Sequence, residues 1–198
     1  MTPEHASIKA REVCELAPVI PVLVIHDASI ARPLAEALVA GGLPALEVTL
    51  RTPAALDVIR EMASVDGGVV GAGTLLTPAD VDAAVKAGAK FGVSPGATDT
   101  ILQACEDADL PLLPGAATSS EVMRLMERGY TVQKFFPAVN FSAIKNKSFN
   151  RAIVPSSFMI STITPAGSNP ASRAKSIAAS VCPALRNTPP LLALRGKI

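Results

Sequence analysis

Short apolar or β-branched runs alternate with helical patterns along the first 138 residues, and a new run begins about every 20 to 25 residues. That interval fits a strand followed by the helix that carries the chain back to the start of a neighbouring parallel strand. We interpret six runs as strands, at residues 19–25, 45–51, 68–74, 90–94, 110–114 and 131–137. The cadence predicts an α/β fold, a (β/α)8 barrel of the TIM type with six recognisable units and with the last two units missing or atypical.

Helical signals occupy the intervals between these runs. They cover residues 30–41, 53–63, 78–87, 99–105 and 119–128. Ser119 precedes Glu121 in a helix-start pattern, and Gly42, Gly88 and Gly129 stand where helices are expected to end. Local signals and the overall cadence therefore favour the same fold.

The composition changes abruptly after Ala138. Residues 1–138 carry 10 basic and 17 acidic side chains, whereas residues 139–198 carry 8 basic and no acidic ones. The second segment also holds all 5 Asn residues of the chain, with 9 Ser and 6 Pro. Its apolar pieces are weak, at residues 158–163 and 178–185, so the β/α cadence stops. We predict barrel units over residues 1–138 and an atypical basic, Ser/Asn/Pro-rich segment over residues 139–198.

Composition also limits the class of protein. The longest apolar stretch near the start, residues 17–25, contains two prolines and is too short to cross a bilayer. Acidic residues precede it, which is unlike the basic n-region of a secretory signal. Three scattered Cys and two His give no zinc-site spacing, and the absence of Trp argues against a base-stacking surface. We expect a cytoplasmic protein with no membrane, nucleic-acid or metal partner.

The run at residues 45–51 places unlike side chains on its two faces. Strand alternation puts three apolar residues on one face and Glu47, Thr49 and Arg51 on the other. In a barrel strand the polar face looks into the lumen, where a carboxylate and a guanidinium are costly unless they serve a ligand. The alternative is an ordinary antiparallel strand with one wet face.

Lys134 lies between apolar neighbours in the run at residues 131–137, with Val132 and Phe136 on the same face. Desolvation disfavours the ammonium form and makes an uncharged amine available to attack a carbonyl. The alternative is a strand-end lysine that extends to water. The two interpretations are equally open at this stage.

Three consecutive strand ends carry small residues, in the segments 71–74, 94–96 and 114–118. Such ends leave room for a ligand above a barrel and bring backbone N–H groups near it. The alternative is that Gly and Pro close these turns for steric reasons alone.

Five motifs together resemble the 2-keto-3-deoxy-6-phosphogluconate (KDPG) aldolase family, whose members often also cleave 2-keto-4-hydroxyglutarate (KHG). They are LVAGGLPALEVTLRT (38–52), VGAGTLLTP (70–78), FGVSPG (91–96), LLPGAAT (112–118) and KFFPA (134–138). The resemblance runs from about Ala17 to Ala138, and it makes residues 1–138 aldolase-type units.

The resemblance implies a class I aldolase that cleaves KDPG to pyruvate and glyceraldehyde 3-phosphate without a metal or other cofactor. Lys134 would form the imine with the keto acid and Glu47 would move protons. The family's other site residues map onto carboxylate contacts at Arg51 and Thr74 and onto pocket-shaping positions at Pro95, Thr118 and Phe136. The resemblance also implies a homotrimer and a small keto-acid substrate.

The match stops after KFFPA. Family members continue with strands that end in Pro-Thr-Gly-Gly-Ile and Gly-Gly-Ser types of turn, which resemble a phosphate cradle, and this chain has neither. We hypothesise a shifted reading frame or a rearranged gene end, which coding DNA would decide against a natural divergent tail.

An unclosed barrel would expose two sheet edges and let water reach the Lys134 amine and the Glu47 carboxylate, so we expect poor or absent aldolase activity. The alternatives are a non-catalytic remnant with a disordered basic tail and a lyase of a related sugar acid.

Overall fold

The computed structural model describes residues 1–17, 19–137 and 159–163 of the chain. Parallel strands form a six-stranded sheet in the order β5-β4-β3-β2-β1-β8, and a second parallel pair joins β6 to β7. The bounds are β1 Val19–Leu23, β2 Ala45–Thr49, β3 Val69–Gly73, β4 Phe91–Val93, β5 Leu112–Leu113, β6 Gly115–Ala116, β7 Lys134–Phe135 and β8 Met159–Ile163. Each of the six predicted strands is present in shortened form, so the predicted cadence is confirmed.

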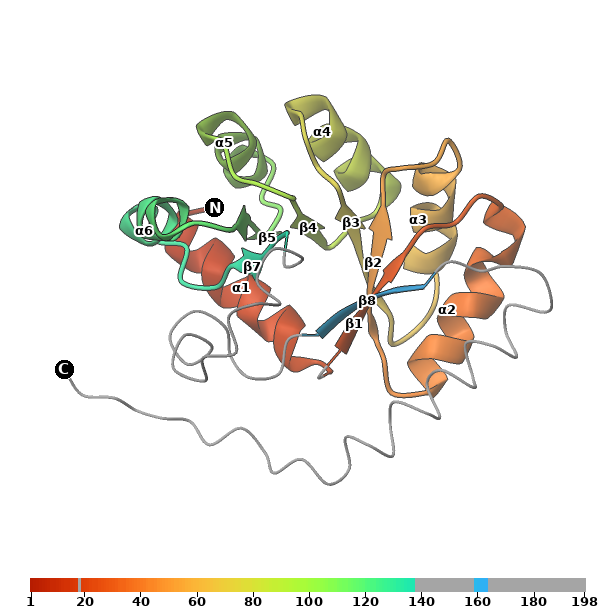
Figure 1. Ribbon diagram of the computed structural model, residues 1–198. Coiled ribbons are helices and arrows are strands. Elements are labelled where there is room, and N and C mark those ends of the chain that lie inside the picture. The colour runs from red at the N-terminus through yellow and green to blue at the C-terminus, as the bar shows by residue number, and fades with distance from the viewer. Residues whose placement is uncertain (18, 138–158, 164–198) are drawn as a thin grey trace, which may run out of the picture.

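Five of the helices lie around the outside of the strands (Figure 1). Their bounds are α2 Ala31–Ala40, α3 Ala55–Ala63, α4 Pro78–Ala87, α5 Asp99–Asp107 and α6 Ser119–Arg128, and a short 3-10 turn, Ala28–Ile30, precedes α2. The expected helix ends hold, because Gly42, Gly88 and Gly129 all adopt positive φ. The expected start of α6 at residue 119 is confirmed, and Thr118 before it is the N-cap and forms a capping box with Glu121.

Helix α1, Pro3–Glu15, was not predicted from the sequence. Thr2 caps it by accepting a hydrogen bond from the backbone N–H of His5, and Pro3 occupies its first turn. Ser7 ties this helix to the chain just before β7, because its Oγ accepts hydrogen bonds from the N–H groups of Thr131 (2.9 Å) and Val132 (3.1 Å). Helix α1 therefore belongs to the barrel although it precedes the first strand.

The fifth strand runs past its predicted end at residue 114 and is interrupted there by Pro114, which has no N–H to donate to a ladder. β5 pairs with β4 before the proline, and β6 pairs with β7 after it. The carbonyl of Pro114 still accepts a hydrogen bond from the N–H of Lys134 at 2.8 Å. This division connects the six-stranded sheet to the short strand that carries Lys134.

β8 changes the expectation of two open sheet edges at one of them, the edge of β1. It lies parallel to β1 over its whole length, with Val19 opposite Met159 and Leu23 opposite Ile163. The edge of β1 is therefore covered by one of the two apolar pieces of the C-terminal segment, and the other piece, at residues 178–185, lies outside the described residues. The division of the chain at residue 138 stays a prediction.

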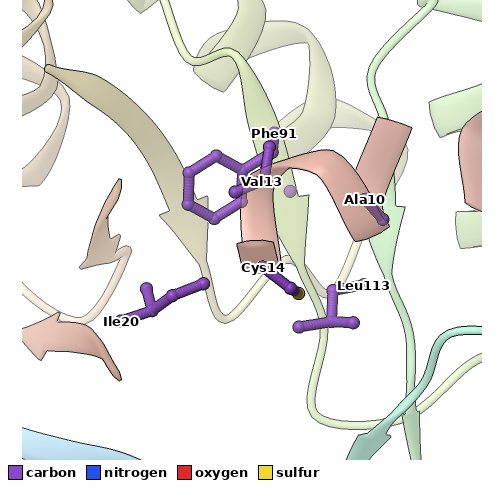
Figure 2. A pocket seen from close by; sticks show the side chains of 7 residues that line it. Ala10, Val13, Cys14, Ile20, Phe91 and Leu113 are labelled. Atoms are coloured by element: carbon purple, nitrogen blue, oxygen red, sulfur yellow. The ribbon is translucent and has the colours of Figure 1, made fainter. Parts of the chain in front are cut away.

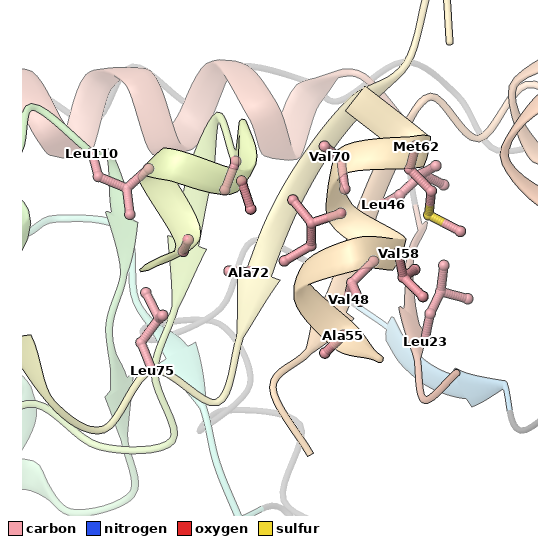
Figure 3. Close-up of a cluster of buried hydrophobic side chains, with 14 of the residues drawn as sticks. Leu23, Leu46, Val48, Ala55, Val58, Met62, Val70, Ala72, Leu75 and Leu110 are labelled. Carbon is pink, nitrogen blue, oxygen red and sulfur yellow. The ribbon is translucent and has the colours of Figure 1, made fainter. Parts of the chain in front are cut away.

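Two apolar clusters fill the fold. The larger lies between the outer faces of the strands and the helices, where Leu46 and Val48 of β2 meet Val58 and Met62 of α3 (Figure 3). The smaller, which we name the apolar layer, lies on the inner faces of the strands and consists of Ile20, Ala45, Phe91, Val93, Leu113 and Val132. Val13 and Cys14 of α1 pack against it around a small apolar cavity (Figure 2). Helix α1 thus closes one end of the barrel interior.

Candidate active site

Glu47 and Lys134 meet inside the barrel, as the alternation of their strands predicts. On β2 the residues Ala45 and Glu47 point inward, while Leu46 packs under the helices. The Nζ atom of Lys134 lies 3.7 Å from Oε1 of Glu47, and their side chains are only 10% and 3% exposed. The expectation that these two groups lose their dry setting is therefore wrong.

Burial determines the electrostatics of Glu47. Desolvation raises the pKa of this carboxyl above the ordinary glutamate value, and the nearby charges of Lys134 and Arg51 offset part of that rise. A carboxyl in this setting holds a proton more readily than one in water, and it can transfer that proton to a basic group beside it. Glu47 therefore has the properties of a proton donor and acceptor next to an amine.

Lys134 is held at the start of β7 by contacts on two sides. Its N–H donates to the carbonyl of Pro114 at 2.8 Å, which fixes the backbone beside β6. Its Nζ lies 5.2 Å from the centre of the Phe136 ring, within the range of a cation–π contact. The expected strand-end lysine that extends to water is not observed, because the side chain is buried.

Arg51 and Thr74 meet at the carboxyl ends of β2 and β3. The Nε–H of Arg51 donates to Oγ1 of Thr74 at 3.2 Å. Thr74 adopts φ +64°, an unusual conformation for a β-branched residue. Strain of this kind costs about 1–3 kcal/mol and concentrates at functional sites. The pair places an exposed guanidinium at the rim of the Glu47 and Lys134 site.

The structure separates Pro95 from Thr118. The backbone of Pro95 lies beside Gly115, the residue opposite Lys134 in the pairing of β6 with β7. Thr118 is exposed, and its hydroxyl accepts a hydrogen bond from the N–H of Glu121 at 3.3 Å. Its observed contact is that of a helix cap.

The space at the glycines of two of the three small strand-end segments is filled by the protein itself, whereas a Cβ on Gly96 of the third would meet nothing within 4 Å. A Cβ atom on Gly71 would meet the Phe91 ring at 2.5 Å, and one on Gly115 would meet the carbonyl oxygen of Pro95 at 2.3 Å. These glycines therefore admit neighbouring parts of the chain rather than a ligand, which corrects the interpretation from sequence. The steric alternative explains them.

Two buried hydroxyls lie in the strands around the site, and only one of them, on Thr49, was placed on an inward face from the sequence. Thr49 lies on the inward face of β2 and donates from Oγ1 to the carbonyl of Leu23 at 3.1 Å. Ser94 follows β4, is fully buried, and its Oγ has no hydrogen-bond partner among the described residues. Strand alternation predicted the inward position of Thr49, whereas nothing in the sequence distinguishes the Ser94 hydroxyl.

Among the described residues, no helix is long and apolar enough to cross a membrane. The same part of the chain contains no group of three or more His, Cys, Asp or Glu side chains that could hold a metal ion.

Known proteins resemble this chain in sequence and in fold. The sequence model of the family described as "KDPG and KHG aldolase" matches residues 10–181, which extends the resemblance beyond residue 138. A 2-dehydro-3-deoxy-phosphogluconate aldolase of Zymomonas mobilis is 51% identical over 132 residues, which are 67% of this chain and 64% of that protein. The chain thus aligns with less than two thirds of the length of that relative.

Solved structures give the same result. The crystal structure of the 2-keto-3-deoxy-6-phosphogluconate aldolase of Zymomonas mobilis with 3-phosphoglycerate superposes with a TM-score of 0.75 at 39% identity, over 87% of this chain and 94% of the other. The KDPG aldolase of Legionella pneumophila, in which pyruvate was captured as a covalent carbinolamine, gives a TM-score of 0.66 at 38% identity, over 81% and 78%. The predicted TIM-type α/β fold is confirmed, and the chain belongs to the KDPG and KHG aldolase family.

Proposed function

We propose that this protein is a class I aldolase that cleaves KDPG to pyruvate and glyceraldehyde 3-phosphate through an imine on Lys134. The observation that carries the proposal is the buried contact of 3.7 Å between Nζ of Lys134 and Oε1 of Glu47. An amine needs its uncharged form to attack a ketone, and a buried carboxyl beside it supplies the proton transfers. The carbinolamine captured in the Legionella relative is an intermediate of this kind of reaction.

The steps follow from the positions of these two groups. The Lys134 amine attacks the keto carbon, and the carbinolamine loses water to form an iminium ion, with Glu47 passing the protons. The Glu47 carboxylate takes the proton of the C4 hydroxyl while the C3–C4 bond breaks, and that electron pair moves into the iminium to give an enamine and free aldehyde. Glu47 then protonates the enamine carbon, and hydrolysis releases pyruvate and the lysine.

Arg51 and Thr74 are proposed to hold the carboxylate of the keto acid, because a guanidinium matches a carboxylate with parallel N–H donors. Phe136 and Pro95 would border the pocket beside Lys134, and Thr118 would do so from the start of α6. A cytoplasmic location and a homotrimer are part of the same proposal. They rest on the sequence and on family resemblance.

Two features that are not expected of an open barrel support activity in this chain. The site is buried, and β8 covers the edge of β1. The main physical argument for a non-catalytic remnant was an open site filled with water, and the burial of Glu47 and Lys134 removes that argument.

Borohydride trapping tests the proposal directly. Incubation with pyruvate and borohydride should leave the reduced pyruvyl adduct on Lys134, detected by peptide mass spectrometry. The matched control is Lys134→Met, which removes the amine and keeps an unbranched apolar stem. An unmodified wild-type protein, or an adduct on another lysine, would overturn the proposal. If Lys134 carries the adduct, the rates of aldehyde release from KDPG and from KHG rank the two substrates.

A further inference from the structure

Gly73, the last residue of β3, occupies an inward position directly against the Glu47 side chain. A Cβ atom placed on Gly73 would lie 2.2 Å from Oε1 of Glu47 and 2.8 Å from both its Cδ and its Cγ. All three contacts are shorter than real Cβ atoms show. The Oε1 atom is also the one that faces Nζ of Lys134 at 3.7 Å. The space at Gly73 is therefore filled by the proton-transfer group itself.

We propose that Gly73 is a positioning residue, whose missing side chain fixes the Glu47 carboxylate at its distance from the Lys134 amine. The inference rests on the proposed aldolase function and adds to it a residue that touches neither substrate nor amine. Its role is exerted through Glu47.

The backbone around Gly73 makes the carboxylate the part that must move. β3 is paired on both sides, with Gly73 opposite Thr49 of β2 and opposite Val93 of β4. The carbonyl of Gly73 accepts a hydrogen bond from the N–H of Leu50 at 2.8 Å. Shifting this strand would break ladder contacts on both sides, whereas the end of a glutamate side chain turns about single bonds. A methyl at residue 73 would thus displace the carboxylate.

Displacement changes the environment of Glu47 in one direction. A carboxylate pushed off the wall of β3 moves either toward water or toward the ammonium of Lys134. Exposure removes desolvation, and a closer cation stabilises the charged form, so both movements lower the pKa of Glu47. Either movement also misaligns the proton transfers of the cleavage step, while the Lys134 amine keeps its place on β7.

The other glycines supply a control. A Cβ on Gly96 would meet nothing within 4 Å, so Gly96→Ala adds the same methyl near the same end of the barrel without a clash. Comparing Gly73→Ala with Gly96→Ala therefore separates the loss of a glycine from the contact with Glu47.

A double-mutant cycle tests the contact without any substrate. Unfolding free energies are measured for wild type, Gly73→Ala, Glu47→Ala and the double variant. We expect Gly73→Ala to destabilise the protein that contains Glu47 and to be tolerated in the Glu47→Ala background, even if Gly73→Ala alone is largely unfolded. An equal cost of the Gly73→Ala substitution in both backgrounds would overturn the inference.

Titration and kinetics test the consequence. Carbon-13 NMR of labelled glutamate, with the Glu47 signal assigned from its loss in Glu47→Gln, should show a lower pKa of Glu47 in Gly73→Ala than in wild type. For KDPG cleavage we expect kcat to fall about 100-fold with little change in KM, while pyruvate is still trapped on Lys134. Gly96→Ala should leave the pKa of Glu47 as it is in wild type, because a methyl at residue 96 meets no neighbour within 4 Å.

An unchanged or raised pKa of Glu47, or an unchanged kcat, would contradict the positioning role. Failure of the proposed function has a different signature, because wild type would then trap no pyruvate. The stability cycle and the titration would still decide the contact between Gly73 and Glu47 in that case.

Discussion

The interior of this barrel has two layers that differ in chemistry although the same strands build them. The apolar layer contains Ala45 of β2 and Val132 just before β7. Two residues further along the same strands lie Glu47 and Lys134, and with Thr49 and Gly73 they form what we name the polar layer. Because every second side chain of a strand points to the same face, the next inward residue after Ala45 or Val132 already belongs to the polar layer.

The difference shows where stability and chemistry are located. The apolar layer is covered by α1 and contributes through burial. The polar layer carries a carboxyl and an amine whose desolvation opposes folding, and burial raises the pKa of the Glu47 carboxyl. We therefore expect substitutions in the apolar layer to lower stability, and substitutions in the polar layer to change reactivity.

The largest effect is expected when a carboxylate is moved into the apolar layer. Ala45→Glu places an unpaired acid at a position that is fully buried, and we expect a loss of about 4–5 kcal/mol in the free energy of unfolding. Ala45→Met controls for added size, because overpacking alone costs less. Chemical denaturation measures both variants. An equal loss in the two would mean that the layers do not differ in their tolerance of charge.

Phe91→Ala removes the largest side chain of the apolar layer. The ring is 2% exposed and fills the space that Gly71 leaves open, so its removal creates a cavity and should cost about 3–4 kcal/mol. The molecules that remain folded should still trap pyruvate on Lys134, since the polar layer keeps its contacts. A folded variant that no longer forms the adduct would show that the two layers are not separable.

The sequence predicted the polar layer because alternation alone orients Glu47 and Lys134 inward. It could not predict the division of the fifth strand at Pro114, which depends on β6 pairing with β7 across the chain. It also misinterpreted the glycines: Gly71 and Gly73 look like room for a ligand until the positions of Phe91 and Glu47 are known.

The termini of the fold were the weakest part of the prediction for a related reason. α1 has clear helix-start residues at Thr2 and Pro3, but the strand cadence gave it no place. β8 is a five-residue strand in a polar segment, and its pairing with β1 supplies the order that its composition does not predict. Both elements are therefore held in place by contacts with distant parts of the chain: α1 through Ser7, and β8 through β1.

Ser7→Ala is expected to weaken the apolar layer from outside. The Ser7 hydroxyl accepts hydrogen bonds from the N–H groups of Thr131 and Val132 and lies 3.0 Å from Oγ1 of Thr131. Its loss leaves the buried N–H of Val132 and the part-buried N–H of Thr131 without this acceptor and should cost about 2 kcal/mol. Hydrogen exchange at these two amides should accelerate. Ser64→Ala is the control, because that exposed hydroxyl bonds only within its own helix end and to Arg32.

The smallest expected effect is a pH dependence of stability that belongs to the polar layer. Burial raises the pKa of Glu47, so between the ordinary glutamate value of 4.5 and the raised value the native state holds a proton that the unfolded chain has lost. This contribution to stability is complete below pH 4.5 and is lost as the pH rises through the native pKa. The side chain of Glu47→Gln does not titrate, so wild type should lose stability relative to this variant as the pH rises from 4 to 8. Glu61→Gln, at an exposed position, should show no pH-dependent difference from wild type. If the difference between Glu47→Gln and wild type is the same at both pH values, the titration of the buried Glu47 carboxyl is not its cause.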